Sequence, residues 1–296
     1  MLPSFVVVGP PRTGTSWLHQ VLKCRTILPQ TKETRFFDVH FHRGVNWYRR
    51  HYVNSGIAGP MGEIAPTYFA SAKACHRIQS LVPAAKIVCV FRDPVERIVS
   101  LYRLKRAYGM IPWSFEDAIL RDSELMESSR YATYLKIWQQ AFGKDRVYTA
   151  FFDDLRTDPQ GFVNVLADFI SIPRFSLTAP ELTALHTSST MTHPRSYRRT
   201  RHANQLADWL KARQLGRIVK VVRTSPLGKL FLGGGQAFAM PSPESLQVVH
   251  ELFRNEIDEL EISSGRNLSA WKGASSTEVI DPLLVEPQSP MRAQEI

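Results

Sequence analysis

The segment that decides the fold is Phe5-Val-Val-Val-Gly-Pro-Pro-Arg-Thr-Gly-Thr-Ser16, near the start of a chain of 296 residues. Its first four residues form a continuous apolar run, which is typical of a strand buried on both faces of a parallel sheet. A turn rich in glycine and proline follows, and apolar side chains then recur at helical spacing from Ser16 to Leu28. This order of strand, glycine turn and helix predicts the opening unit of a nucleotide-binding α/β domain.

The same pattern returns further along the chain. Lys86–Phe91 is a second apolar run, and Asp93 and Pro94 are residues that favour the start of a helix, here one that reaches about Ala107. Further strands are predicted at 61–64 and 146–152, and further helices at 131–142, 159–170 and 243–262. Strands that alternate with helices favour a parallel sheet covered on both faces. We therefore expect a single P-loop-like α/β domain, with a central parallel β-sheet flanked by helices and helical additions at the C-terminal end.

The domain is expected to span residues 1–272. Residues 273–296 are rich in serine, proline and acidic residues without periodicity, which predicts a disordered tail. Of all residues 44% are apolar and 22% are charged, enough for a buried core and too polar for an integral membrane protein. There is no basic leader before the first apolar run and no run of 18 apolar residues, so we expect a cytoplasmic protein without a membrane span. Cys24, Cys75 and Cys89 lie far apart, which disfavours a disulfide scaffold or a cysteine zinc site.

The glycine turn nearly matches the phosphate-binding pattern G-x-x-x-x-G-K-[ST], with Thr15 in place of the lysine. Glycines let successive backbone N–H groups converge on a phosphate, and the N-terminus of the following helix adds further donors. Arg12 supplies a cation within the loop. The loop therefore suits an anionic group but is poorly built for ATP hydrolysis, which uses the missing lysine. The alternative is a tight turn that only starts a helix.

A second motif follows the second predicted strand, Arg92-Asp-Pro-x-x-Arg97-x-x-Ser100. Ligands bind at the carboxyl ends of parallel strands, so Arg92 is expected to face the same crevice as the glycine loop. Arg97 and Ser100 are three residues apart and share a helix face, and an arginine with a serine hydroxyl can bind a second phosphate. Taken alone, the motif is equally explained as a helix start. Together with the loop it suggests a nucleotide phosphorylated at two separated positions.

These and other segments resemble the PAPS-dependent sulfotransferases, most closely the carbohydrate branch typified by heparan sulfate sulfotransferases and their bacterial relatives. The segments that carry the resemblance are Pro10-Pro-Arg-Thr-Gly-Thr-Ser-Trp-Leu18, Lys32-Glu-Thr-Arg-Phe-Phe-Asp38, Glu63-Ile-Ala-Pro-Thr-Tyr-Phe69, Arg92-Asp-Pro-Val-Glu-Arg-Ile-Val-Ser-Leu-Tyr102, Tyr131-x-x-Tyr-Leu-x-x-Trp138, Phe152-Asp-Asp-Leu-x-x-Asp-Pro159 and Leu260-Glu-x-x-x-Gly-Arg-x-Leu-Ser-x-Trp271. They occur in the family's order and cover the chain to about residue 272.

The resemblance implies PAPS as co-substrate and no metal. It assigns the 5′-phosphosulfate to Arg12, Thr13, Gly14, Thr15, Ser16 and Trp17. It assigns the 3′-phosphate to Arg92 and Ser100. The basic stretch Arg195–Arg201 resembles a late segment that covers the nucleotide in relatives, so Arg195 is counted with the nucleotide-binding residues. A solvated basic face is the alternative for that stretch.

For catalysis, the resemblance makes Glu33 the general base, which takes the proton from an acceptor hydroxyl as its oxygen attacks sulfur. Lys32 and Arg12 would stabilise charge on the transferring group or on the departing phosphate. A loop carboxylate paired with Lys32 or Arg35 is the alternative for Glu33. The rival bases are His40, His42 and His51. One departure from the family is Ile64, which stands where heparan-type enzymes carry a lysine.

The sequence thus predicts a sulfotransferase that moves the sulfuryl group from PAPS to a hydroxyl of a glycan or glycolipid and releases PAP. A P-loop kinase or NTPase with a degenerate lysine is the second hypothesis. The net charge of +10, and nine basic residues against Asp208 between Arg195 and Arg223, raise a third, a nucleic-acid-binding protein. No RNA-reading aromatic signature accompanies this charge, so no nucleic-acid partner is expected beyond the nucleotide.

Overall fold

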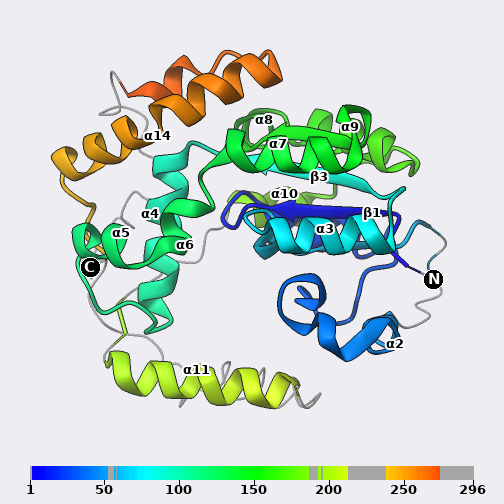
Figure 1. The fold of residues 1–296 in the computed structure, drawn as a ribbon, viewed down its shortest axis with the longest axis horizontal. Helices are drawn as coiled ribbons and strands as arrows, with labels where there is room; N and C mark the ends of the chain where they lie inside the picture. The colour runs from blue at the N-terminus through cyan, green and yellow to red at the C-terminus, as the bar shows by residue number, and fades with distance from the viewer. Residues whose placement is uncertain are drawn as a thin grey trace, which may run out of the picture.

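The centre of the molecule is a sheet of four parallel strands in the order β2-β1-β3-β4 (Figure 1). The computed structural model describes residues 2–52, 57, 59–186, 193–194, 196–212 and 238–273, with the backbone alone at 208, 209, 211 and 212. The strands are β1 (Phe5–Gly9), β2 (Gly62–Ile64), β3 (Lys86–Phe91) and β4 (Val147–Phe151). Helices lie on both faces of the sheet, so the predicted fold class is confirmed.

Alternation along the strands sorts the core into two layers, because successive side chains point to opposite faces of a sheet. Val6 and Val8 pack in one cluster with α3 (Ala72–Leu81) and α7 (Tyr131–Phe142), which lie in front of the sheet in Figure 1. Phe5 and Val7 pack in the other with α1 (Thr15–Leu22) and α9 (Pro159–Ile170). The continuous apolar runs of the sequence are therefore explained by burial on both faces.

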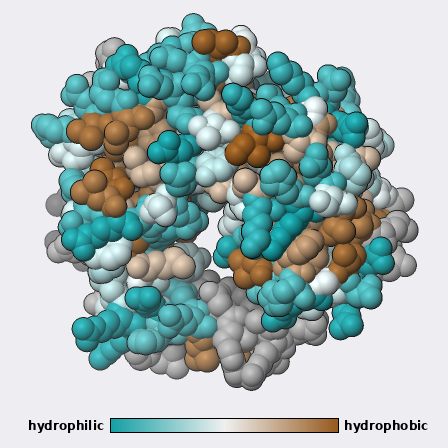
Figure 2. Space-filling model, in the orientation of Figure 1, coloured by the Kyte–Doolittle hydropathy of each residue, from teal (hydrophilic) through white to brown (hydrophobic). Residues whose placement is uncertain are grey.

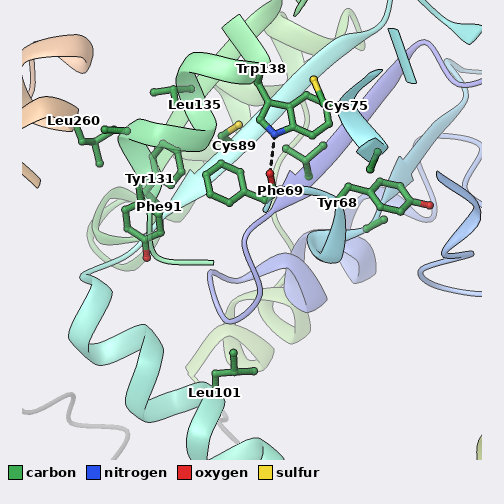
Figure 3. Packing of buried hydrophobic residues seen from close by; sticks show 14 of the residues in the cluster. Tyr68, Phe69, Cys75, Cys89, Phe91, Leu101, Tyr131, Leu135, Trp138 and Leu260 are labelled. Carbon is green, nitrogen blue, oxygen red and sulfur yellow. Dashed lines mark hydrogen bonds between the residues drawn. The ribbon is translucent and has the colours of Figure 1, made fainter. Parts of the chain in front are cut away.

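Aromatic packing fixes the end of β3. The Trp138 indole Nε1 donates a hydrogen bond to the Phe69 carbonyl at 3.0 Å (Figure 3). Beside this pair, the Phe91 ring stacks on Tyr131 with centroids 4.7 Å apart. The Tyr131 hydroxyl then donates to the Arg92 carbonyl at 2.8 Å. The core thus holds the backbone at the point where the second motif begins.

The predicted helix after β3 is confirmed as α4 (Pro94–Ala107), and the Asp93 carboxylate accepts hydrogen bonds from the N–H groups of Val95 and Glu96. The predicted end of the first helix at Leu28 is wrong, because α1 ends at Leu22. Beyond it the chain turns, and Ile27 forms a parallel bridge with Met61 beside the sheet. The apolar residues after Leu22 therefore extend the sheet edge rather than the helix.

The remaining elements connect and cover these layers. The final helix, α14 (Pro243–Ser264), begins as predicted and contacts α7 and α4. Other elements are η1 (Phe36–His40), η2 (Phe41–Arg43), α2 (Gly44–Arg49), η3 (Pro66–Tyr68), α5 (Phe115–Arg121), α6 (Ser123–Glu127), η4 (Lys144–Arg146), α8 (Phe152–Thr157), α10 (Ala179–His186), α11 (Tyr197–Ala212) and η5 (Ser269–Lys272). Arg195 and residues 274–296 of the predicted tail lie outside the described residues. Within the described ranges, no helix combines the length and apolar character needed to cross a bilayer.

Strands β1 and β2 fit together through a glycine. Phe5 and Gly62 are register partners, and a Cβ atom at Gly62 would lie 2.0 Å from Cζ of the Phe5 ring. The ring therefore occupies the space that a side chain at residue 62 would need. The next residue, Glu63, faces the opposite side of the sheet, among residues of the α3 and α7 layer.

Candidate active site

The glycine loop joins β1 to α1 at the carboxyl edge of the sheet. Gly14 has φ +83°, and a Cβ atom there would lie 2.8 Å from Cδ2 of Leu155, so only glycine fits. The Thr13 hydroxyl donates to the Pro10 carbonyl at 2.8 Å and closes the turn. No side chain in the described part of the protein caps α1. The N–H groups of its first turn are therefore available to an anion.

Arg12 connects this loop to the second motif. Its Nε donates to the Ser100 hydroxyl at 2.9 Å, across 88 residues of sequence. Burial, and then the charge of Arg92, lower the pKa of Arg12 to about 10. The two guanidinium groups are therefore close enough to repel each other. The loop and the second motif thus come together, as the sequence predicts, and the group of Arg12, Arg92 and Ser100 is called the crevice from here on.

Arg92 is almost wholly buried. Its Nε and Nη2 each lie 2.9 Å from Oε2 of Glu96, and Nη1 of Arg156 lies 3.5 Å from the same oxygen. The Arg92 guanidinium also stands 4.8 Å from the centre of the Phe152 ring. One carboxylate is thus shared by two cations, with Arg12 as a third nearby. Arg12, Arg92 and Arg156 thus lie close together, and such a group of cations attracts anionic groups.

Lys32 and Glu33 lie next to the start of α1, where the glycine loop ends. The Lys32 ammonium donates to the Ser16 hydroxyl at 2.7 Å and lies 3.2 Å from Oε1 of Glu33. Both side chains are about 30% exposed, so they remain accessible from solvent. This ion pair is equally consistent with a catalytic role and with a structural contact within the loop. The contact with Ser16 is what places the pair at the start of α1.

An opening leads toward this edge of the sheet. Figure 2 shows the surface hollowed near the middle of the displayed face, with both hydrophilic and hydrophobic residues at its edge. Comparison with the ribbon in the same orientation places the hollow between the carboxyl end of β1 and α11 (Figure 1).

Comparison with known proteins decides what kind of enzyme carries this site. The model of the sulfotransferase domain matches residues 2–215. The chain belongs to the sulfotransferase family. The predictions of the family and of a sulfotransferase enzyme are therefore confirmed.

Its relatives include vertebrate heparan sulfate enzymes. The bifunctional heparan sulfate N-deacetylase/N-sulfotransferase 2 of Bos taurus is 28% identical over 198 residues, 59% of this chain. Enzyme 3 of the same name from Homo sapiens is 30% identical over 195 residues, 58% of this chain. The match spans only 22% of each relative's length. A sulfotransferase from Alicyclobacillus acidocaldarius shares the fold, with a TM-score of 0.67, 18% identity, and coverage of 92% of this chain and 100% of that one.

One predicted contact of this sulfotransferase is wrong. Arg97 does not share a phosphate site with Ser100: it is fully buried, its Nε donates to the Ser129 hydroxyl at 2.7 Å, and its Nη2 donates to the Leu125 carbonyl. Residues three apart lie about 60° apart around a helix, enough to turn one inward and leave the other at the rim. Arg97 thus ties α4 to α6, and Arg12 is the guanidinium that reaches Ser100.

Three other predicted positions are buried. The Trp17 indole donates to the Glu181 carbonyl at 2.7 Å and faces α10, which leaves its backbone N–H as the group that can face the loop. Thr15 is 4% exposed, so the sulfotransferase has no reaching cation where an NTPase carries lysine. Ile64 is 1% exposed and packs in the α1 and α9 layer. The cation beside Glu33 is Lys32, whose Nζ lies 3.2 Å from Oε1 of Glu33.

The histidines considered as rival bases lie around Trp47. The rings of His40 and His51 stand 5.3 and 4.4 Å from Trp47, with His42 beside His40. Burial lowers the pKa of both His40 and His51. His19 on α1, which the sequence analysis did not single out, has its pKa lowered to about 4 by burial and then by Lys32 and Lys23. No cluster of three metal-ligating side chains occurs within the described ranges.

Glu63 is the residue whose importance the sequence analysis missed. It was noted as part of a motif without a role, yet it is a fully buried carboxylate surrounded by hydroxyl groups. Burial raises the pKa of Glu63, and hydrogen bonds from Thr34, Tyr48 and Tyr68 oppose that rise. A carboxylate within a strand that also contains Gly and Ile was the available signal, because a buried charge requires dedicated partners.

Proposed function

We propose that this sulfotransferase uses PAPS as donor, transfers its sulfuryl group to a hydroxyl of a carbohydrate or glycolipid, and releases PAP. The single observation that carries the proposal is the contact of Arg12 with Ser100 beside Arg92. It joins the glycine loop and the second motif into one positively charged crevice. A nucleotide with anionic groups at both its 5′ and 3′ positions has charges to match both motifs.

The residues divide between the two ends of the nucleotide. The backbone N–H groups from Thr13 to Trp17, the Ser16 hydroxyl and Arg12 would hold the 5′-phosphosulfate. Arg92 and Ser100 would hold the 3′-phosphate, with Arg12 in contact with both sets through Ser100. Arg195 would provide a further nucleotide contact. PAPS supplies the sulfuryl group.

The chemistry then needs a base and charge stabilisation. Glu33 takes the proton of the acceptor hydroxyl while the acceptor oxygen forms its bond to sulfur. The bond between that sulfur and the 5′-phosphate oxygen breaks, and its electron pair stays on the phosphate. Lys32 and Arg12 stabilise the negative charge that develops there. The contacts of Lys32 with both Ser16 and Glu33 support this role.

The carbohydrate acceptor is supported by the names of the relatives, which are heparan sulfate N-sulfotransferases. Because those names specify transfer to nitrogen, a sugar amine is the informative competitor to a hydroxyl. Transfer of labelled sulfate from PAPS should therefore be measured with matched glycans that offer a free hydroxyl, a free amine or neither. Labelling of the hydroxyl-only glycan is expected, and labelling confined to the amine would overturn the hydroxyl assignment.

Calorimetric binding of PAP, ADP and ATP·Mg²⁺ tests the donor. We expect PAP to bind far more tightly than ADP, and the Arg92→Ala variant to lose about 100-fold in PAP affinity, since truncating one partner of a buried charge pair costs about 2–5 kcal/mol. The affinity for ADP, which lacks the 3′-phosphate, should change little in this variant. Arg121→Ala, at an exposed ion pair on α5, is the matched control. Preference for ATP·Mg²⁺ would favour a kinase instead.

A further inference from the structure

The Glu63 pocket consists of Glu63, Thr34, Tyr48 and Tyr68. Oε1 of Glu63 accepts hydrogen bonds from the Thr34 hydroxyl at 2.6 Å, the Thr34 backbone N–H at 3.1 Å and the Tyr68 hydroxyl at 3.1 Å. Oε2 accepts from the Tyr48 hydroxyl at 2.6 Å. All four residues are buried, with Glu63 at 0% exposure. Such a set of donors fixes both oxygens of the carboxylate in place.

Two of these four hydrogen bonds come from Thr34, the residue that follows Glu33. Glu33 has φ +62° and Arg35 has φ +54°, so left-handed residues flank Thr34 on both sides. Residues other than glycine seldom adopt this conformation, and it persists only where surrounding contacts enforce it. The Thr34 hydroxyl also accepts a hydrogen bond from the Phe36 N–H at 3.2 Å, at the start of η1. Glu63 is thus the anchor of a strained turn.

Glu63 and the glycine loop are both connected to strand β1. Glu63 pairs in register with Val6 of β1, and β1 continues directly into the loop. The proposed nucleotide site is therefore built from the end of β1, and the Glu33 turn is held by the strand beside it. A shift of β2 along β1 would move the turn relative to the loop.

We propose that Glu63 is a positioning residue for Glu33: through Thr34 it holds the left-handed turn that directs Lys32 and Glu33 toward Ser16 and the glycine loop. This inference rests on the proposed role of Glu33 as base. Glu63 itself touches neither the nucleotide nor the acceptor. If it served only to stabilise the fold, its loss would weaken nucleotide binding and turnover together.

Three variants and a control separate these roles. Thr34→Val keeps the side-chain shape and removes the hydroxyl that binds Glu63. Glu63→Met removes all acceptors, whereas Glu63→Gln keeps an oxygen for Thr34 and Tyr68 and offers an amide to Tyr48. Tyr52→Phe is the control, because its hydroxyl contacts Tyr48 and the Gly62 carbonyl but not Thr34.

We expect kcat to fall about 100-fold in Glu63→Met and about tenfold in Thr34→Val, because a misplacement of about 1 Å can cost about 100-fold in rate. PAP affinity and the KM for PAPS should stay within about twofold, and Glu63→Gln should recover most of the lost kcat. Tyr52→Phe should match the parent. Equal losses of PAP affinity and kcat, or unchanged kcat in folded Thr34→Val, would overturn the proposal.

Amide hydrogen exchange gives a readout that does not need turnover. The Thr34 N–H is bound by Glu63, so its exchange in the full chain should accelerate in Glu63→Met and stay parental in Tyr52→Phe. A parent protein that fails to transfer sulfuryl groups would refute the proposed function, whereas unchanged Thr34 exchange would refute the anchor. If Glu63→Met does not fold, Thr34→Val decides the question through the ratio of kcat to PAP affinity.

Discussion

The Glu63 pocket and the crevice around Arg12 and Arg92 both bury charged side chains, but they compensate the charge differently. In the pocket, four donors converge on one carboxylate. In the crevice, Arg92 and Arg156 both lie within 3.5 Å of the Glu96 carboxylate, and Arg12 donates to a neutral serine. The pocket therefore matches its carboxylate with neutral donors, whereas the crevice brings like charges close together.

The largest expected effect lies at the junction of these two regions. Glu33→Gln should lower turnover by about 10²- to 10⁴-fold, the range for loss of a general base, because the amide cannot accept the proton. PAP affinity should stay within about twofold, since Glu33 lies outside the crevice. Parallel assays of sulfuryl transfer and PAP calorimetry check both. Full turnover in this variant would show that Glu33 is not the general base and would favour one of the histidines.

The second largest effect concerns stability, because substitutions in the two regions should change the free energy of unfolding differently. Glu63→Met leaves the Thr34, Tyr48 and Tyr68 donors without their acceptor and should lower the free energy of unfolding by about 3 kcal/mol. Arg12→Met should leave it unchanged or raise it, because the lowered pKa of Arg12 shows that folding disfavours its charge. Urea denaturation of both variants provides the measurement. If Arg12→Met lost more free energy of unfolding than Glu63→Met, the proposed difference between the two regions would be wrong.

A smaller effect is expected for the serine that links the crevice. Ser100→Ala removes the acceptor that orients the Arg12 Nε, so PAP affinity should fall by up to about tenfold, the equivalent of one hydrogen bond. Calorimetry with PAP measures this loss. Ser80→Ala, whose hydroxyl donates to the His76 carbonyl on the exposed side of α3, should bind PAP like the parent. Equal behaviour of the two variants would contradict the bridging role of Ser100.

The smallest effect concerns pH. Because the pKa of His19 is lowered to about 4 in the folded protein, the unfolded chain binds a proton at this residue at a higher pH than the folded one. Stability should therefore decrease as the pH falls from about 6.5 toward 4. In His19→Leu, the difference in Tm between pH 7 and pH 4.5 should be smaller than in the parent. His42→Gln, at an exposed histidine, should keep the parental difference.

Most contacts of the crevice could be predicted from the sequence, whereas few contacts of the Glu63 pocket could. β3, α4, α7 and α9 lie within a residue of their predicted bounds, because apolar periodicity and capping residues are local signals. Placing Arg92 beside the glycine loop needed only the rule that ligands meet at the carboxyl edge of parallel strands.

The errors and omissions arise from contacts distant in sequence. Arg97 binds partners 28 and 32 residues away, so its helix face alone did not show where its guanidinium lies. Glu63 binds Thr34 and Tyr48, which lie 29 and 15 residues before it. Neither spacing belongs to a local pattern. The strained backbone at Glu33 and Arg35 was equally invisible, because nothing in the residue types demands a positive φ there.

Gly62 shows how mutational tolerance can depend on shape rather than chemistry. Any side chain at this position would collide with the Phe5 ring and push β2 away from β1. The displacement would carry Glu63 with it, and through Thr34 the turn that presents Glu33. In a scan of every single substitution, selection for activity should therefore reject changes at Gly62 as firmly as changes at Glu33, although glycine contributes no functional group.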